Sequence, residues 1–325
     1  MTAPVLEIHL SDSDAADALH HDARVGLSAD PKWLPSKWFY DARGSELFEQ
    51  ITTLPEYYPT RTERELLRRS VGKIAARATV DTLVELGSGS SGKTRLLLDA
   101  LTANGSLQRF VPLDVSEPAL RGAMAAVARE YPELAVHGVV GDFTQHLELL
   151  PAGQDRRRLV AFLGGTIGNL LPDERAVFFT ALRAALNPGE LLLLGAGLVT
   201  DPAVMVPAYD DAAGVTAEFN RNVLCVLNRE LGADFEVGAF DHVAVWDATH
   251  EWIEMRLRAR RAMTVRLSAV GMTVRYAKGE EMRTEVSGKF RREGLGAELV
   301  DAGFAEQTWW TDPDDRFAVV LAATA

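Results

Sequence analysis

The sequence predicts an α/β protein whose centre is an open, mostly parallel sheet with helices on both faces. Short apolar runs alternate with segments of helical periodicity from about residue 82 to residue 194, and this β-α-β rhythm is typical of such sheets. The rhythm breaks after Val199, and two further apolar runs close the chain. A length of 325 residues favours two domains, or one α/β domain with a large insertion.

The segment before the sheet is helical at first and then rich in aromatic residues. Residues 12–27 have helical spacing. A dense run of Trp, Tyr, Phe and Pro follows, and within it residues 45–54 predict a short helix stopped by Pro55. A further helix is expected from Thr60 or Thr62 to about residue 78.

The predicted elements divide the chain into a sheet domain and an insertion. The expected strands of the sheet are 82–86, 110–115, 136–140, 159–163 and 190–194, with helices at 93–103, 117–130 and 172–186. After Val199 we expect a helix at 214–231, antiparallel strands at 241–247, 251–261 and 263–276, a helix at 292–302, and closing strands at 307–311 and 317–322. The sheet domain is therefore predicted to comprise 61–199 and 289–325, with an α+β insertion at 200–288. The N-terminal segment, 1–60, is expected to pack with the insertion.

Composition excludes several classes of function. The formal net charge of −12 disfavours binding to nucleic acid, which needs a basic face. The longest apolar run, at 190–199, is far shorter than the ~20 residues of a membrane-spanning helix, and the N-terminus lacks a secretory signal. Cys225 is the one cysteine, so an internal disulfide is excluded, and its apolar helical surroundings predict a core position. No His, Asp or Glu spacing suggests a metal site, and a cytoplasmic monomer is expected.

The segment 84–95, VELGSGSSGKTR, raises the main functional question. It matches G-x-x-x-x-G-K-[ST], the loop that wraps the phosphates of ATP or GTP. A P-loop NTPase also needs a second acidic residue at the end of another strand to complete its Mg²⁺ site. Asp114 and Asp142 are available, but neither closes a long apolar run of the kind such a strand usually has.

A nucleoside cofactor accounts for more of these residues. Glu85 ends the first strand, and Gly87 begins a turn in which glycines permit close approach of the backbone to a ligand. Asp114 ends the second strand, and in such folds an acidic residue at this position accepts hydrogen bonds from the ribose hydroxyls. Asp142 and Phe143 follow the third strand and suit an adenine, with a carboxylate for the amine and an aromatic face for the ring.

The order of these features resembles the class I S-adenosylmethionine-dependent methyltransferases. The glycines also satisfy the G-x-G-x-x-G fingerprint of nicotinamide enzymes, so they do not by themselves exclude a dehydrogenase. Glu85 ahead of the loop and the closing hairpin near 307–322 favour the methyltransferase. The resemblance implies a Rossmann-like class I methyltransferase sheet with an inserted α+β substrate-binding domain, and it places Lys93 near the methionine carboxylate of the cofactor.

Longer strings narrow the resemblance to one family. The segment 35–63, PSKWFYDARGSELFEQITTLPEYYPTRTE, together with FLGGTIGNL, AYDDAAGVTAEFNRNVL and EMRTEVSGKF, is similar to the histidine-specific Nα-methyltransferases of ergothioneine biosynthesis. This resemblance covers nearly the whole chain. It implies that three methyl groups pass successively from S-adenosylmethionine to the α-amine of free L-histidine, which gives hercynine. The same fold acting on another amino acid or small amine is the nearest alternative.

The resemblance also implies roles for individual residues. Tyr57 would contact the substrate amine and Asn169 the amine and carboxylate, and these two are the expected catalytic pair. The other expected substrate contacts are Tyr209 to the carboxylate, Glu285 and Ser287 to the imidazole nitrogens, Thr216 through water, and Phe48 and Met255 as pocket walls. The expected cofactor contacts are Tyr40, Glu85, Gly87, Lys93, Asp114, Asp142, Phe143 and Gly164. Gly288 stands where some relatives have cysteine, so the floor of the imidazole site is expected to differ slightly.

Overall fold

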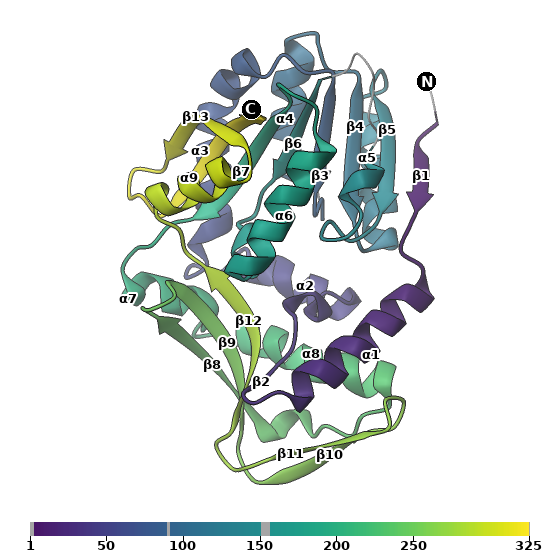
Figure 1. The fold of residues 1–325 in the computed structure, drawn as a ribbon, viewed down its shortest axis with the longest axis vertical. Coiled ribbons are helices and arrows are strands. Elements are labelled where there is room, and N and C mark those ends of the chain that lie inside the picture. Colours follow the sequence, from purple (N-terminus) through teal and green to yellow (C-terminus); the bar gives the residue numbers. More distant parts are fainter. Residues whose placement is uncertain (1–2, 90–91, 151–156, 325) are drawn as a thin grey trace. The chain divides into compact units, whose positions relative to one another are not determined.

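The computed structural model describes residues 3–89, 92–150 and 157–324 and divides the chain into two units (Figure 1). The first unit comprises Met1–Ser11, Thr62–Leu198 and Phe290–Ala325, and the second comprises Asp12–Arg61 and Val199–Lys289. Among the described residues, no helix combines the length and apolar character that crossing a bilayer requires.

The first unit contains a sheet of eight strands in the order β1-β5-β4-β3-β6-β7-β14-β13. Their bounds are β1 Val5–Ile8, β3 Thr82–Leu86, β4 Arg109–Asp114, β5 Ala135–Val140, β6 Arg158–Phe162, β7 Leu191–Gly197, β13 Phe304–Thr311 and β14 Phe317–Thr324. The first six strands of that order pair in parallel, whereas β14 is antiparallel to both of its neighbours. The closing antiparallel hairpin that the sequence predicted is therefore confirmed.

Helices cover both faces of this sheet, because strands that are apolar on both sides need two layers to bury them. The helices are α3 Tyr58–Arg77, α4 Thr94–Ala103, α5 Glu117–Glu130, α6 Pro172–Ala185 and α9 Arg292–Asp301, with short 3₁₀ turns at η2 Leu147–Leu149 and η3 Thr166–Asn169. One apolar cluster joins α3, α4 and α5 to one face, and a second joins α6 and α9 to the other. Figure 1 shows α6 crossing in front of the strands.

The second unit is built on a four-stranded sheet in the order β2-β12-β9-β8, with a separate hairpin of β10 and β11. The bounds are β2 Lys32–Trp33, β8 Phe240–Asp247, β9 Trp252–Ala259, β10 Met263–Leu267, β11 Met272–Tyr276 and β12 Glu281–Gly288. Its helical elements are α1 Asp12–Ser28, η1 Ser36–Phe39, α2 Ala42–Ile51, α7 Pro202–Met205, η4 Val206–Tyr209, α8 Val215–Leu231 and η5 Val237–Ala239. Helix α8 packs against α2 and the sheet, and one apolar core joins them.

Several local predictions were wrong. Residues 5–8 form β1, which pairs with β5, so the first residues belong to the sheet unit and not to the second unit. Strand β12 was not predicted, although Glu281, Arg283 and Glu285 alternate with buried residues along it. The run at 263–276 is a hairpin of two strands rather than one strand, because the chain reverses at Gly271, where φ is +65°.

Cys225 also differs from expectation. It lies on α8, but its side chain is exposed, whereas its neighbours Leu224 and Val226 are buried. Successive helical residues point about 100° apart, so an apolar run does not place each of its members in the core.

Candidate active site

In the glycine loop between β3 and α4, the backbone adopts conformations that residues with a side chain rarely adopt. Gly87 has φ of +69° and Gly89 of +47°, both in the left-handed region that favours glycine. A Cβ added at either position would meet no atom of the described residues within 4 Å, its chain neighbours aside. The backbone here therefore borders open space, which fits a ligand lying close to the loop. Ser90 and Ser91, in the middle of the loop, lie outside the described residues.

Glu85 holds this loop to the helix that follows it. Its carboxylate is buried at the end of β3 and accepts hydrogen bonds from the hydroxyls of Ser88 and Thr94. Burial raises the pKa of Glu85 to about 7, and the two hydrogen bonds oppose that rise. Both carboxylate oxygens thus serve to shape the loop, and a direct contact between Glu85 and a cofactor stays a prediction.

Asp114 ends β4 and Asp142 follows β5, so these two acidic residues lie at the same edge of the sheet. Asp114 accepts hydrogen bonds from the backbone N–H of Gly89 at 3.0 Å and of Ser116 at 2.9 Å, so it is fixed against the glycine loop. Asp142 accepts from the backbone N–H of Thr144 at 2.8 Å. Both carboxylates are half-buried and remain able to accept further hydrogen bonds from a ligand.

Phe143 is held by other aromatic rings. Its centroid lies 5.0 Å from that of Phe162 and 5.9 Å from that of Phe178. Part of the ring is therefore used in the core of the first unit, and the rest is exposed to an intermediate degree. This arrangement gives a ring of fixed orientation beside Asp142.

Lys93 is engaged by a residue that the sequence analysis missed. Its ammonium pairs with the carboxylate of Glu63, a completely buried residue of α3. The same carboxylate accepts the backbone N–H of Gly164 at 2.7 Å, and Gly164 has φ of +84°. Glu63 thus ties the loop after β6 to the glycine loop. No local pattern marks it, since a lone Glu in a helix is usually solvated.

The predicted substrate residues of the second unit include a group of aromatic rings. Phe48 lies 6.1 Å from Tyr57 and 5.6 Å from Tyr40 between ring centroids, and Tyr57 lies 6.2 Å from Tyr209. Phe219 of α8 adds a further contact to Phe48 at 6.0 Å. The three contacts among Tyr40, Phe48, Tyr57 and Tyr209 are edge-to-face and fix the orientations of these rings, so the rings form one wall of a candidate pocket.

A buried polar cluster lies next to Tyr209. The hydroxyls of Tyr209 and Ser287 are 2.7 Å apart, and the Lys289 ammonium donates to both, at 2.9 and 2.7 Å. Burial raises the pKa of the Tyr209 phenol, and burial lowers the pKa of Lys289 to about 8. Lys289 is a second residue that the sequence analysis missed. The alternation along β12 was the available signal, because it places Ser287 and Lys289 on one side.

The remaining predicted substrate residues of this unit lie on β9, β12 and α8. Met255 is buried and pairs across the strands with Glu285, whose charge contributes to the raised pKa of Tyr209. Thr216 is buried at the start of α8, and its hydroxyl makes no hydrogen bond of normal geometry among the described residues, although it lies near the Asp211 carboxylate. That hydroxyl is available to a ligand.

The predicted cofactor and substrate residues do not divide strictly between the two units. Asn169, expected to bind substrate, lies in the first unit at the end of η3. Tyr40, expected to bind the cofactor, lies in the second unit beside Phe48. The other predicted cofactor residues lie in the first unit and the other predicted substrate residues in the second.

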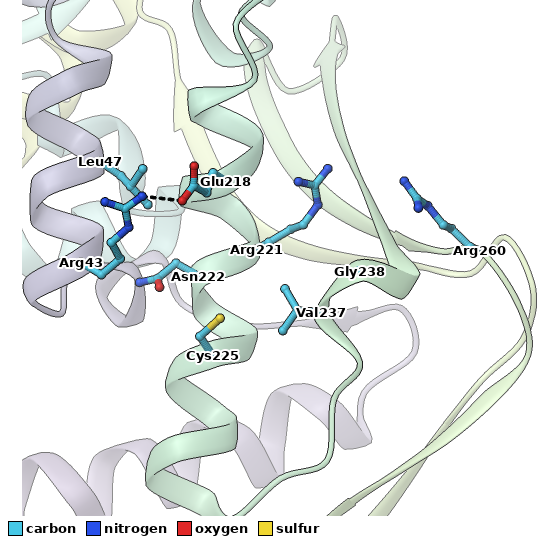
Figure 2. Close-up of a pocket in the computed structure, with 9 residues that line it drawn as sticks. All are labelled: Arg43, Leu47, Glu218, Arg221, Asn222, Cys225, Val237, Gly238 and Arg260. Atoms are coloured by element: carbon cyan, nitrogen blue, oxygen red, sulfur yellow. Dashed lines mark hydrogen bonds and ion pairs between the residues drawn. The ribbon is translucent and has the colours of Figure 1, made fainter.

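A surface cavity of about 550 Å³ in the second unit involves none of the predicted site residues (Figure 2). It is lined by Arg43, Leu47, Glu218, Arg221, Asn222, Cys225, Val237, Gly238 and Arg260. Figure 2 shows the Arg43 guanidinium directed at Glu218, with which it forms an ion pair. The cavity explains why the Cys225 sulfur is exposed.

Comparison with known proteins assigns the chain to a family. A family model described as histidine-specific, SAM-dependent methyltransferase matches residues 19–324. The chain belongs to this family. Two relatives named histidine N-alpha-methyltransferase are similar over nearly their whole length. The one from Mycolicibacterium smegmatis is 56% identical and covers 97% of each chain, and the one from Mycobacterium tuberculosis is 55% identical and covers 97% of this chain and 98% of its own. Among solved structures, the CcbJ methyltransferase from Streptomyces caelestis is similar over 88% of this chain and 100% of its own, with a TM-score of 0.47 and 17% identity.

Family membership confirms the predicted fold class and S-adenosylmethionine as the methyl donor of this histidine-specific methyltransferase. It gives no support to a P-loop NTPase, and the contacts of the loop agree. An NTPase would need the Lys93 ammonium for phosphate and the Thr94 hydroxyl for Mg²⁺. Here the Lys93 ammonium pairs with Glu63, and the Thr94 hydroxyl donates a hydrogen bond to Glu85. Within the described part of the chain, no group of three or more His, Cys, Asp or Glu residues is placed to hold a metal ion.

Proposed function

We propose that the protein transfers three methyl groups in succession from S-adenosylmethionine to the α-amine of free L-histidine, giving hercynine for ergothioneine biosynthesis. The observation that carries this proposal is the near full-length similarity to two proteins named histidine N-alpha-methyltransferase. The buried polar cluster of Tyr209, Ser287 and Lys289 supports it, because such a cluster can hydrogen-bond to a polar acceptor, whereas a purely apolar acceptor offers it no partner.

On the cofactor side, the first unit offers a glycine turn, two carboxylates and a cation. We propose that Gly87 and Gly164 allow close approach of the backbone, that Asp114 accepts the ribose hydroxyls, and that Asp142 accepts the adenine amine beside Phe143. Lys93 would face the methionine carboxylate, and Tyr40 and Glu85 complete the proposed set. When bound, S-adenosylmethionine supplies a methyl group on a sulfonium, which makes that group electrophilic.

On the acceptor side, the reaction needs an aligned and deprotonated amine. Displacement at the methyl carbon is in line, so positioning of the amine lone pair is the main requirement. We propose that Tyr57 and Asn169 supply it. Both side chains are neutral, whereas a carboxylate at the same place would favour the unreactive ammonium form.

The histidine side chain and carboxylate would be bound mainly by the second unit, which we propose as the substrate-binding part of the protein. Glu285 and Ser287 would hydrogen-bond to the imidazole nitrogens, with Thr216 acting through water. Tyr209 would bind the carboxylate, and Phe48 and Met255 would enclose the ring. Gly288 leaves the floor of this site without a side chain. A monomeric state and a cytoplasmic location stay predictions, and light scattering after size-exclusion chromatography would test the first.

The decisive experiment is mass spectrometry of the products formed from purified protein, S-adenosylmethionine and a mixture of the twenty amino acids. We expect histidine carrying one, two and finally three methyl groups, and no other methylated amino acid. Methylation of a different amino acid would favour the alternative acceptor, and no methylation would overturn the proposed function. Magnesium-dependent ATP hydrolysis, assayed on the same preparation, should be absent.

Lys93→Met should weaken S-adenosylmethionine binding by about tenfold, the effect of losing one charge-assisted hydrogen bond. It should also lower the thermal midpoint, because the buried Glu63 carboxylate loses its counter-charge. Calorimetric titration and differential scanning fluorimetry measure the two effects. Adding Glu63→Gln should restore the midpoint without restoring affinity. Lys73→Met, which removes an exposed lysine of α3, is the control and should change neither. Unchanged affinity in folded Lys93→Met would exclude the proposed role.

A further inference from the structure

We infer that Lys289 is a positioning residue that sets the direction of hydrogen bonding in the Tyr209–Ser287 pair, so that the pair presents one outward donor to the substrate side chain. The inference rests on the proposed function, since it concerns how the imidazole is recognised. It assigns a role to a buried cation that the methyl transfer itself does not require.

The contacts of Lys289 are those of a fixed donor. The residue follows β12 and is only 7% exposed, and its ammonium donates to Tyr209 at 2.9 Å and to Ser287 at 2.7 Å. Nζ also lies 4.8 Å from the centre of the Tyr209 ring. A buried ammonium with hydroxyl partners is costly to desolvate, so a structural role alone would be served better by an apolar side chain.

Counting hydrogens gives the direction of the network. An ammonium group can only donate, so both hydroxyl oxygens accept from Lys289. Tyr209 and Ser287 carry one hydroxyl hydrogen each, and the 2.7 Å contact between their oxygens uses at most one of the two. At least one hydrogen is left for the substrate ring, and the other can go to the substrate carboxylate, as proposed for Tyr209. Neither hydrogen can be donated to the Lys289 ammonium. The pair therefore favours a ligand with an unprotonated ring nitrogen.

The charged groups around Lys289 keep it protonated near neutral pH. Burial lowers its pKa to about 8, while electrostatic interactions with Tyr58 on α3 and with the Glu285 carboxylate on β12 oppose that shift. Tyr209 on η4 remains a neutral phenol, because burial raises its pKa. Above about pH 8 the neutral amine gains a lone pair and can accept, and the fixed direction of hydrogen bonding is lost.

This arrangement complements a neutral imidazole. Such a ring has one N–H, which the Glu285 carboxylate can accept, and one bare nitrogen, which needs a donor. The Tyr209–Ser287 pair supplies that donor only while Lys289 is protonated. A phenyl or thiophene ring of similar size offers no comparable acceptor, so the pair discriminates against it.

The test compares two ligands that share the α-amine and carboxylate, L-histidine and 3-(2-thienyl)-L-alanine, by calorimetric titration in the presence of S-adenosylhomocysteine. In the unmodified protein, the ratio of their affinities should fall about tenfold, the effect of one lost hydrogen bond, as the pH rises from 7 to 9.5. Both ligands carry the same α-amine, so its titration changes the two affinities alike and does not change their ratio.

Two variants sharpen the result. In Lys289→Met no side-chain amine can accept the outward hydroxyl hydrogen at high pH, so the affinity ratio should no longer depend on pH in this range. Lys278→Met, which removes an exposed lysine between β11 and β12, should behave like the unmodified protein. A flat ratio in the unmodified protein, with histidine still bound and methylated, would overturn the role of Lys289 alone. Absence of histidine binding would overturn the proposed function as well.

Discussion

Glu285→Ala should reduce kcat/KM for histidine by about 10- to 150-fold and widen the range of amino acids that are methylated. The reduction corresponds to the loss of a hydrogen bond to a charged group, about 1.5–3 kcal/mol. The wider range follows from the environment of Glu285. When a ring that cannot hydrogen-bond is bound, the half-buried carboxylate is left unpaired, and this weakens the binding of that ring. Removing the carboxylate removes the penalty, and it also makes room opposite Met255, its partner across the strands.

Competition assays with equimolar histidine, phenylalanine and tryptophan, analysed by mass spectrometry, would measure the change in preference. The matched control is Glu281→Ala, which removes a carboxylate of the same strand that pairs with Arg256 and Arg258. This control should keep the preference for histidine. If Glu285→Ala also kept the full preference for histidine, Glu285 would not be the residue that recognises the imidazole.

Glu190→Ala should destabilise the protein by about 3–5 kcal/mol, a large part of the roughly 5–15 kcal/mol that stabilises a typical domain. Glu190 precedes β7 and is 2% exposed, and Arg158 at the start of β6 is 1% exposed. Their side chains are joined by two hydrogen bonds, of 2.8 and 2.6 Å. Removing the carboxylate leaves a buried guanidinium without its counter-charge at the base of the parallel sheet.

Urea denaturation followed by circular dichroism would measure this loss. Glu117→Ala, which breaks the exposed pair with Arg121 on α5, is the control and should cost no more than about 1 kcal/mol. The double variant Arg158→Met with Glu190→Leu should recover most of the stability, because an apolar pair can replace a buried ion pair. A small loss in Glu190→Ala would show that water or another group reaches Arg158 readily.

The parts of the fold that could be predicted are those in which local periodicity and burial agree. Strands such as β3 and β7 are buried and mostly apolar because both faces of the sheet are covered, and helix α5 begins after Ser116, whose side chain caps it. The strands β1 and β12 escaped prediction for different reasons. The first is short and at a sheet edge, and the second carries three charged residues that are only partly buried.

Some residues of the candidate site could likewise be predicted from the sequence, and others could not. Glycines with positive φ, acidic residues at strand ends and the aromatic segment are all visible in the sequence, because each follows from a local backbone requirement or a recognisable string. Glu63 and Lys289 were not singled out, because a charged side chain in a helix or strand is most often solvated.

The sequence by itself determined the alternating sheet, the glycine loop and the family to which the chain belongs. Those features depend on neighbouring residues or on strings long enough to be specific. Only the tertiary structure decided which charged groups are buried and what they hold: Glu63 between Lys93 and Gly164, Glu85 between Ser88 and Thr94, and Lys289 between Tyr209 and Ser287. The physical reason is that the cost of burying a charge depends on partners that folding supplies from other turns, strands and loops.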